Sequence, residues 1–206
     1  MGQMSYDHRK GDVRAVVDVY KECPEFESDR FKIRFVEEED VEDLLEVYSD
    51  KNALPFFNSD NCNGDNFYYP TREKMQEAIA FWLSSYETRW FVRFTIIDKR
   101  STVAIGTIEM FRRESADTFN GDGVLRLDVR SDHENETDIF DMISLVLPKF
   151  YGLFGCDGII TKAPNYAVER IKAITKCGFK KSNELLIGTH DGYAYNGYWK
   201  AKNKEA

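Results

Sequence analysis

The middle of the chain, residues 90–130, constrains the fold most because it reads as three successive β-strands. WFVRFTII, TVAIGTIEMF and VLRLDVR are rich in β-branched and aromatic residues, and segments of turn-forming residues separate them. Strands that follow one another through such loops pair as antiparallel neighbours. A three-stranded meander is therefore the expected centre of the fold.

Further strands and helices are expected on both sides of the meander. Residues 31–36 alternate as a strand, and residues 41–48 and 71–86 place apolar side chains at helical spacing. Residues 158–163 form a short apolar strand that we expect to join the sheet in parallel, after a helical crossover. The predicted fold class is α+β, with a mostly antiparallel twisted sheet that is flanked by helices.

Two local motifs in the second half of the chain predict where elements begin and turn. Ser131 and Glu134 match a capping box at the start of a helix, and Pro148 is expected to remove the last turn of that helix. Asp191 and Gly192 suit a two-residue turn between alternating segments. The chain should therefore close with a C-terminal hairpin.

The sequence predicts one domain preceded by an extension. Residues 1–30 are expected to be a helical extension, because Val13, Val16 and Tyr20 recur on one helical face. Residues 31–206 would then form a single domain, as the total length of 206 residues suggests.

Composition and charge exclude several classes of partner and site. Hydrophobic residues make up 42% of the chain, which is enough for a packed core, and the net charge of -8 opposes binding to nucleic acid or to an anionic membrane. The start, MGQMSYDHRKGDVR, lacks the apolar region of a signal peptide, so the cytoplasm is the expected location. Cysteines and histidines are scattered without ligand spacing, and no metal site is expected.

Three motifs carry a resemblance to a known family. FKIRFVEEEDVEDLLEVYSD resembles the L-x-L-R-x-x-x-x-x-D opening of the ribosomal-protein acetyltransferase branch of the GNAT superfamily, the acetyl-CoA-dependent N-acetyltransferases. TVAIGTIEMF is similar to the IG-x-I-x-L strand of that branch, and IKAITKCGFK to its K-x-G-F helix end. The order and spacing of these motifs agree over residues 30–182.

The resemblance implies a GNAT-like fold, acetyl-CoA as cofactor and transfer of the acetyl group to an amine. The acceptor would be an amine of a small molecule or of a protein, and its identity is left open. A catalytically silent GNAT-fold protein that binds a ligand or partner is the alternative. A homodimer is one option for its assembly.

The turn that holds the CoA pyrophosphate in this family, Gln/Arg-x-x-Gly-x-Gly/Ala, is altered here. Its three defining positions fall on Glu134, Thr137 and Ile139. Side chains in place of glycine hold the backbone amides away from phosphate oxygens, and a carboxylate repels them. By resemblance, the backbone of Leu127 and Val129 would still bond the pantetheine arm, and Thr137 would lie nearest the pyrophosphate. The sequence thus predicts a weak or absent acetyl-CoA site.

Charged residues inside apolar strands are the candidate catalytic groups. Glu109 is expected to be partly buried on the strand face of Ile105 and Phe111, where it could act as a general base. Arg126 and Asp128 share one face of the next strand, and Asp128 is the second catalytic candidate. The alternative is that Arg126 neutralises Glu109 in a salt bridge without catalysis.

The segment FFNSDNCNGDNFYY, residues 56–69, lies between the first two helices, where the family shapes its acceptor site. The residues that could bind a polar amine substrate are Asn58, Asp60, Asn61, Tyr68, Tyr69 and Arg126. A loop in which asparagine and aspartate side chains cap their own backbone is the alternative, and the sequence does not decide between the two.

Overall fold

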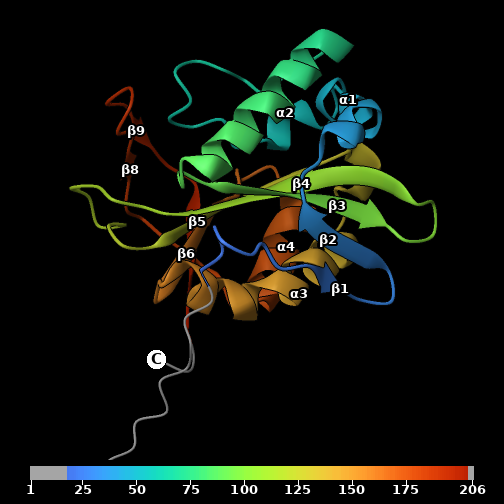
Figure 1. Ribbon diagram of the computed structural model, residues 1–206. Helices are drawn as coiled ribbons and strands as arrows, with labels where there is room; N and C mark the ends of the chain where they lie inside the picture. The colour runs from blue at the N-terminus through green and yellow to red at the C-terminus, as the bar shows by residue number, and fades with distance from the viewer. Residues whose placement is uncertain (1–17, 204–206) are drawn as a thin grey trace, which may run out of the picture.

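A mixed sheet organises the part of the chain that the computed structural model describes, residues 18–203 (Figure 1). Its strands lie in the order β1-β2-β3-β4-β5-β6-β10-β7. Their bounds are Phe26–Glu27 (β1), Phe31–Phe35 (β2), Val92–Asp98 (β3), Val103–Arg112 (β4), Gly123–Val129 (β5), Gly158–Lys162 (β6), Lys180–Lys181 (β7) and Tyr198–Lys202 (β10). A separate two-stranded ladder joins β8 (Leu186–Ile187) to β9 (Ala194–Tyr195).

The pairing of the strands confirms the predicted sheet. Strands β1 to β5 are antiparallel neighbours, β6 joins β5 in parallel, and β10 pairs antiparallel with both β6 and β7. The three central strands form the expected meander, and the fold class is α+β. The register between β4 and β5 sets Glu109 opposite Arg126.

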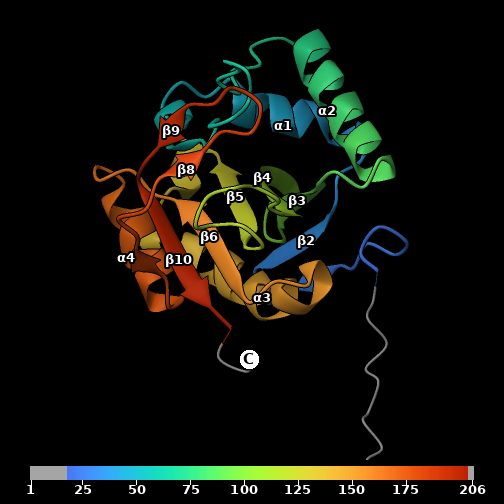
Figure 2. The same ribbon diagram turned by 90° about the vertical axis from the view of Figure 1, so that its left-hand side faces the viewer.

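Helices cover both faces of this sheet, as both views show (Figure 1, Figure 2). The helices are α1 (Val41–Tyr48), α2 (Arg72–Glu87), α3 (Glu136–Phe154) and α4 (Val168–Lys176), with short 3-10 turns η1 (Glu38–Asp40), η2 (Leu54–Phe56) and η3 (Ser131–His133). One buried apolar cluster packs α3 and α4 on the sheet, and a second packs α1 and α2 on the opposite face. The sheet is therefore buried on two sides, which explains why both alternating sets of β5 are buried.

The helix starts were predicted correctly for α2 and incorrectly for α3. The Thr71 side chain caps α2, as a threonine before an apolar run suggests. The capping box at Ser131 and Glu134 is wrong, because Ser131 begins a 3-10 turn instead. Asn135 is the N-cap of α3, and its side chain accepts a hydrogen bond from the Asp138 amide at 3.0 Å.

Pro148 does not remove the last turn of α3, which continues to Phe154. A proline inside a helix loses one backbone hydrogen bond. Here the buried side chains of Leu147, Phe150 and Phe154 hold the final turns on the core, and this burial outweighs the lost bond.

The C-terminal hairpin is shorter than predicted. Strands β8 and β9 pair over two residues each, and residues 188–193 connect them in place of a two-residue turn. Gly197 then redirects the chain with a φ of 82°, and β10 leaves the hairpin to pair with β6 and β7. A longer ladder in the main sheet satisfies more backbone groups than an extended hairpin would.

A β-bulge changes the face of one predicted residue. The register between β3 and β4 shifts between Ile96 and Ile97, which leaves Ile105 as an extra residue of β4. Ile105 therefore packs in the α3 cluster, whereas Phe111 packs on the α1 and α2 face. The expectation that Ile105 shares a face with Glu109 was wrong, because a bulge reverses the alternation.

The N-terminal extension is described only in part. The expected helix around residues 13–20 lies mostly outside the described residues. Strand β1 pairs with β2, so the sheet begins before residue 31 and the boundary between residues 1–30 and 31–206 stays a prediction. Within residues 18–203, no helix combines the length and apolar character that crossing a membrane requires.

Candidate active site

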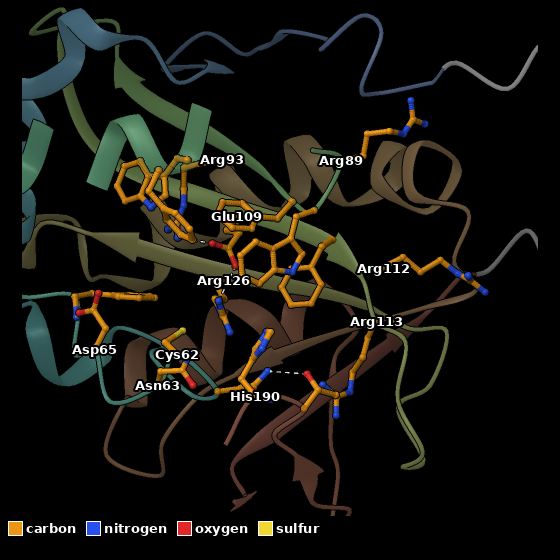
Figure 3. A pocket seen from close by; sticks show the side chains of 18 of the residues that line it. Cys62, Asn63, Asp65, Arg89, Arg93, Glu109, Arg112, Arg113, Arg126 and His190 are labelled. Atoms are coloured by element: carbon orange, nitrogen blue, oxygen red, sulfur yellow. Dashed lines mark hydrogen bonds and ion pairs between the residues drawn. The ribbon is translucent and has the colours of Figure 1, made fainter. Parts of the chain in front are cut away.

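The meander brings three charged side chains into one row across its strands. Arg93 of β3 pairs in register with Glu109 of β4, and Glu109 with Arg126 of β5. One carboxylate oxygen of Glu109 accepts from Arg126 Nη1 at 2.7 Å, and the other accepts from Arg93 Nη2. The row is buried and its side chains point toward one another (Figure 3). The predicted pairing of Glu109 with Arg126 is confirmed.

Asp128 lies deeper than this row. Its Oδ2 atom accepts from Arg93 Nη1 at 3.1 Å and from the Tyr48 hydroxyl at 3.0 Å, and its side chain is fully buried. Burial raises the pKa of Asp128, although the charge of Arg93 opposes this shift. Asp128 does not line the cavity that lies over the row. No contact with that cavity supports its predicted catalytic role.

A cavity of about 560 Å³ lies over the charged row. Its walls come from β3 to β5, from the loop at residues 61–69, from the end of α2 and from residues 189–190 of the hairpin. Most of its apolar wall is aromatic, formed by Phe67, Tyr69, Phe81, Trp82, Trp90, Phe91 and Phe111. The cavity therefore combines a charged floor with aromatic sides, a composition that suits a small organic ligand.

Two segments far apart in the sequence meet at the cavity. The Asn61 side chain donates to Thr189 Oγ1 at 3.2 Å and accepts from the His190 amide at 2.7 Å. Cys62, Asn63 and His190 accordingly lie together on one side of the cavity (Figure 3). Burial raises the pKa of the Cys62 thiol to about 11, which leaves it protonated near neutral pH.

The six predicted substrate residues divide into two groups. Asn61, Tyr69 and Arg126 line the cavity. Asn58 is buried outside the lining, and Tyr68 does not line it either. Half of the predicted substrate set thus lies where a ligand could touch it.

Asp60 anchors the loop instead of facing the cavity. Its carboxylate binds Lys162 of β6 and accepts from the Tyr198 hydroxyl of β10 at 3.1 Å, and its carbonyl accepts from Arg126 Nη2 at 2.8 Å. Asp60 therefore positions Arg126 and the loop through contacts with distant strands. The alternative of self-capping is seen at Asn58, Asp65 and Asn66, whose side chains accept from the amides two residues further on.

Sequence reasoning missed Arg93 and the aromatic wall. Arg93 is a charge inside the apolar run WFVRFTII, the same signal that singled out Glu109, and could have been found by it. Trp82 and Phe67 lie over its guanidinium, at 4.4 Å and 5.7 Å from the ring centres. No pattern joins Trp90 to His190, whose rings meet at 5.4 Å, because their contact is long-range.

Leu127, one of the predicted cofactor residues, and Glu134 of the predicted turn lie at a second place, where Arg170 contacts both. We call this place the β5–α4 junction (Leu127, Glu134 and Arg170). The pairing of β5 with β6 ends at Leu125, and Arg170 of α4 donates from Nη1 to the Leu127 carbonyl at 2.9 Å. Arg170 also binds both carboxylate oxygens of Glu134, at 2.8 Å and 2.6 Å.

The loop before α3 uses its own amides. The Ser131 amide donates to Asp50 Oδ2 at 2.9 Å, the His133 amide to the Arg130 carbonyl at 2.9 Å, and the Glu134 amide to the Ser131 carbonyl at 3.2 Å. These donors are not free to bind a phosphate.

In this arrangement, contacts within the chain occupy part of the place predicted for acetyl-CoA. The Leu127 carbonyl is already hydrogen-bonded, Val129 is buried, and Thr137 is exposed as the second residue of α3. Across residues 18–203, no group of three or more histidine, cysteine or carboxylate side chains is arranged to hold a metal ion.

Comparisons with known proteins identify the fold. No protein-family model matches the sequence, and no curated protein matches it. A GNAT-family acetyltransferase from Bacillus anthracis is similar in structure, with a TM-score of 0.65 and 12% identity over 88% of this chain and 99% of that one. Ribosomal-protein-S5-alanine acetyltransferase from Vibrio fischeri has a TM-score of 0.63 and 14% identity, over 88% and 98% of the two chains.

A third similar structure is Mycobacterium smegmatis RimJ in complex with CoA-disulfide, with a TM-score of 0.64 and 12% identity over 85% of this chain and 83% of that one. At sequence identities of 12% to 14%, structural similarity establishes the fold alone. The chain has the GNAT fold, as the three motifs predicted. Ribosomal-protein acetyltransferases, the branch to which those motifs pointed, are among the similar structures.

Proposed function

We propose that the protein is an N-acetyltransferase that takes an acceptor amine in the cavity over the charged row and acetyl-CoA as the acetyl donor. One observation carries the proposal. Asn61 and Tyr69 of the predicted acceptor segment line the same cavity as Glu109 and Arg126, the predicted charged residues of the meander. The GNAT fold of the similar acetyltransferase structures supports it.

The Glu109 carboxylate is the group best placed to hold the amine. A carboxylate has about four lone-pair sites, and the structure shows one arginine donor on each oxygen of Glu109. The remaining sites can accept N–H bonds from the ligand, and the aromatic wall can stack on its apolar part or face its positive charge. The other charged residues of the lining are of both signs: Asp65 and Glu114 favour a cationic amine, and Arg89, Arg112 and Arg113 favour an acidic group elsewhere on the ligand.

The acceptor is an amine of a small molecule or of a protein. One similar structure is a ribosomal-protein-S5-alanine acetyltransferase, which makes the N-terminal amine of a peptide one class to test. The size of the cavity, about 560 Å³, lies in the usual range for small-molecule sites and supports the other class. The cytoplasm as location and a homodimer as assembly remain predictions.

Release of CoA from acetyl-CoA in the presence of small amines and of short peptides tests the proposal. We expect release that depends on one amine class, and a rate at least tenfold lower in Glu109→Gln, about 1.4 kcal/mol of transition-state stabilisation. Glu77→Gln on the exposed side of α2 is the matched control and should keep the wild-type rate. Amine-independent release, or a Glu109→Gln rate equal to wild type, would contradict the assignment.

A second candidate function is a silent GNAT-fold protein that binds a ligand in the same cavity without transfer. The similar structures do not favour it, whereas the filled β5–α4 junction does. Amines that raise the melting temperature and are never acetylated, even after the junction is opened by mutation, would favour this function over the first.

A further inference from the structure

The β5–α4 junction contains an ion pair that occupies the place predicted for the pantetheine arm. We infer that the Arg170–Glu134 pair is an intramolecular latch, so that coenzyme A enters the junction only after the pair has opened. The choice of coenzyme A as the ligand rests on the proposed function. The latch itself rests on contacts within the folded chain.

The geometry of the pair is that of a strong, buried ion pair. Two nitrogens of Arg170 bind the two oxygens of Glu134, at 2.8 Å and 2.6 Å, and the exposed fractions of the two side chains are 2% and 6%. A bidentate guanidinium–carboxylate contact is short and directional, and few water molecules compete with it at this burial. Glu134 thus turns inward to Arg170 and not toward solvent.

The latch also binds the backbone on both sides of the junction. Arg170 Nη1 donates to the Leu127 carbonyl at 2.9 Å and to the Phe56 carbonyl at 3.1 Å. The guanidinium therefore joins α4 to β5 and to the end of η2. A ligand that approaches the Leu127 carbonyl from this side meets the Arg170 guanidinium, which is already bonded there.

A second contact closes the same region from outside. The Tyr166 hydroxyl, in the loop before α4, donates to the Pro55 carbonyl at 2.6 Å, and the Tyr166 ring meets the Phe56 ring at 5.9 Å between centroids. The amides of Ser131, His133 and Glu134 in the loop before α3 are also bonded within the chain, so internal contacts hold this side of the junction as well.

Opening the latch requires that both charged side chains, Arg170 and Glu134, move. Removing one member of a buried pair leaves an unpaired charge, which is strongly unfavourable, so both side chains must leave together or find new partners. A pair with a purely structural role would make the opposite prediction: deleting it would weaken the fold and would not improve binding of coenzyme A.

Calorimetric titration with coenzyme A tests the latch. The double substitution Arg170→Ala with Glu134→Ala removes both charges together, and Lys172→Ala with Glu169→Ala removes an exposed pair from the same helix as the matched control. We expect the first variant to bind coenzyme A at least tenfold more tightly than wild type, and the control to bind as wild type does. Equal or weaker binding by the folded latch variant would overturn the inference.

A measurement on the wild-type protein covers the case in which the double variant does not fold. The Arg170 Nε–H resonance, assigned by its loss in Arg170→Lys, should shift or disappear when coenzyme A is added to saturation. Saturation with an unchanged resonance, or no binding at all by wild type, would each overturn the latch. A latch variant that binds coenzyme A and transfers no acetyl group would overturn the proposed function and leave the latch standing.

Discussion

Two buried ion networks of this molecule differ in what lies beside them. The row of Arg93, Glu109 and Arg126 borders a cavity of about 560 Å³, whereas Arg170 and Glu134 fill the β5–α4 junction. Both networks are hydrogen-bonded and charge-balanced once Asp128 is counted with the first. Burial of charge therefore does not identify a ligand site by itself, and the open space beside the charge does.

The networks also differ in the number of partners that each arginine holds together. Arg93 binds two carboxylates and the hydroxyls of Tyr48 and Thr107, all of them buried. Arg170 binds one carboxylate and two backbone carbonyls. Loss of Arg93 leaves Asp128 unpaired and Glu109 with one arginine in place of two, whereas loss of Arg170 leaves Glu134 unpaired.

The largest expected effect is that of Arg93→Met. It leaves Glu109 short of one partner and Asp128 without its cation, so we expect the free energy of unfolding to fall by about 3–5 kcal/mol in urea titrations. Arg72→Met removes an exposed pair with Glu42 and should cost less than about 1 kcal/mol. If Arg93→Met cost as little as Arg72→Met, water would have to reach the row of Arg93, Glu109 and Arg126 more than its contacts indicate.

A third, nearly buried pair at the rim of the cavity gives a pH-dependent comparison. Partial burial opposes ionisation of Asp117, but hydrogen bonds from Arg113, Ser115 and the amides of Ile187 and Phe119 outweigh it and lower its pKa to about 2. Because this pKa is depressed in the folded state, Asp117 stabilises the protein above its ordinary pKa near 3.8, and the contribution is lost as pH falls toward 2.

Urea titrations at about pH 5 and about pH 2.5 measure this contribution. Wild type should lose about 1–2 kcal/mol more than Asp117→Asn between the two conditions. An equal loss in both proteins would show that other carboxylates govern the loss of stability at low pH.

The smallest expected effect concerns the helix start next to the β5–α4 junction. Asn135→Ala removes the side-chain bond to the Asp138 amide and should lower the free energy of unfolding by about 1 kcal/mol, and Asn135→Asp should restore it. Ser131→Ala should cost clearly less, since Ser131 is not the cap. If Ser131→Ala lowered the free energy of unfolding more than Asn135→Ala, the predicted capping box at Ser131 and Glu134 would be correct after all.

The sequence was informative wherever local pattern and burial agree. Alternation predicted β2 to β6, helical spacing predicted α1 and α2, and a charge inside an apolar strand predicted the partnership of Glu109 with Arg126. Predictions failed where one local signal stood against long-range packing. Pro148 remains in α3 because its neighbours are buried. Ile105 changes face because of a β-bulge, which the alternating sequence pattern does not reveal.

By itself the sequence determined the order of the central strands and helices and the GNAT fold, because periodicity and motif spacing are local properties. Tertiary structure alone decided that Asp60 anchors a loop, that Trp90 meets His190, and that Arg170 reaches the Leu127 carbonyl. Each of these contacts joins residues more than 40 positions apart. Side chains at such separations meet only when the whole sheet and its helices have packed, so no local pattern records them.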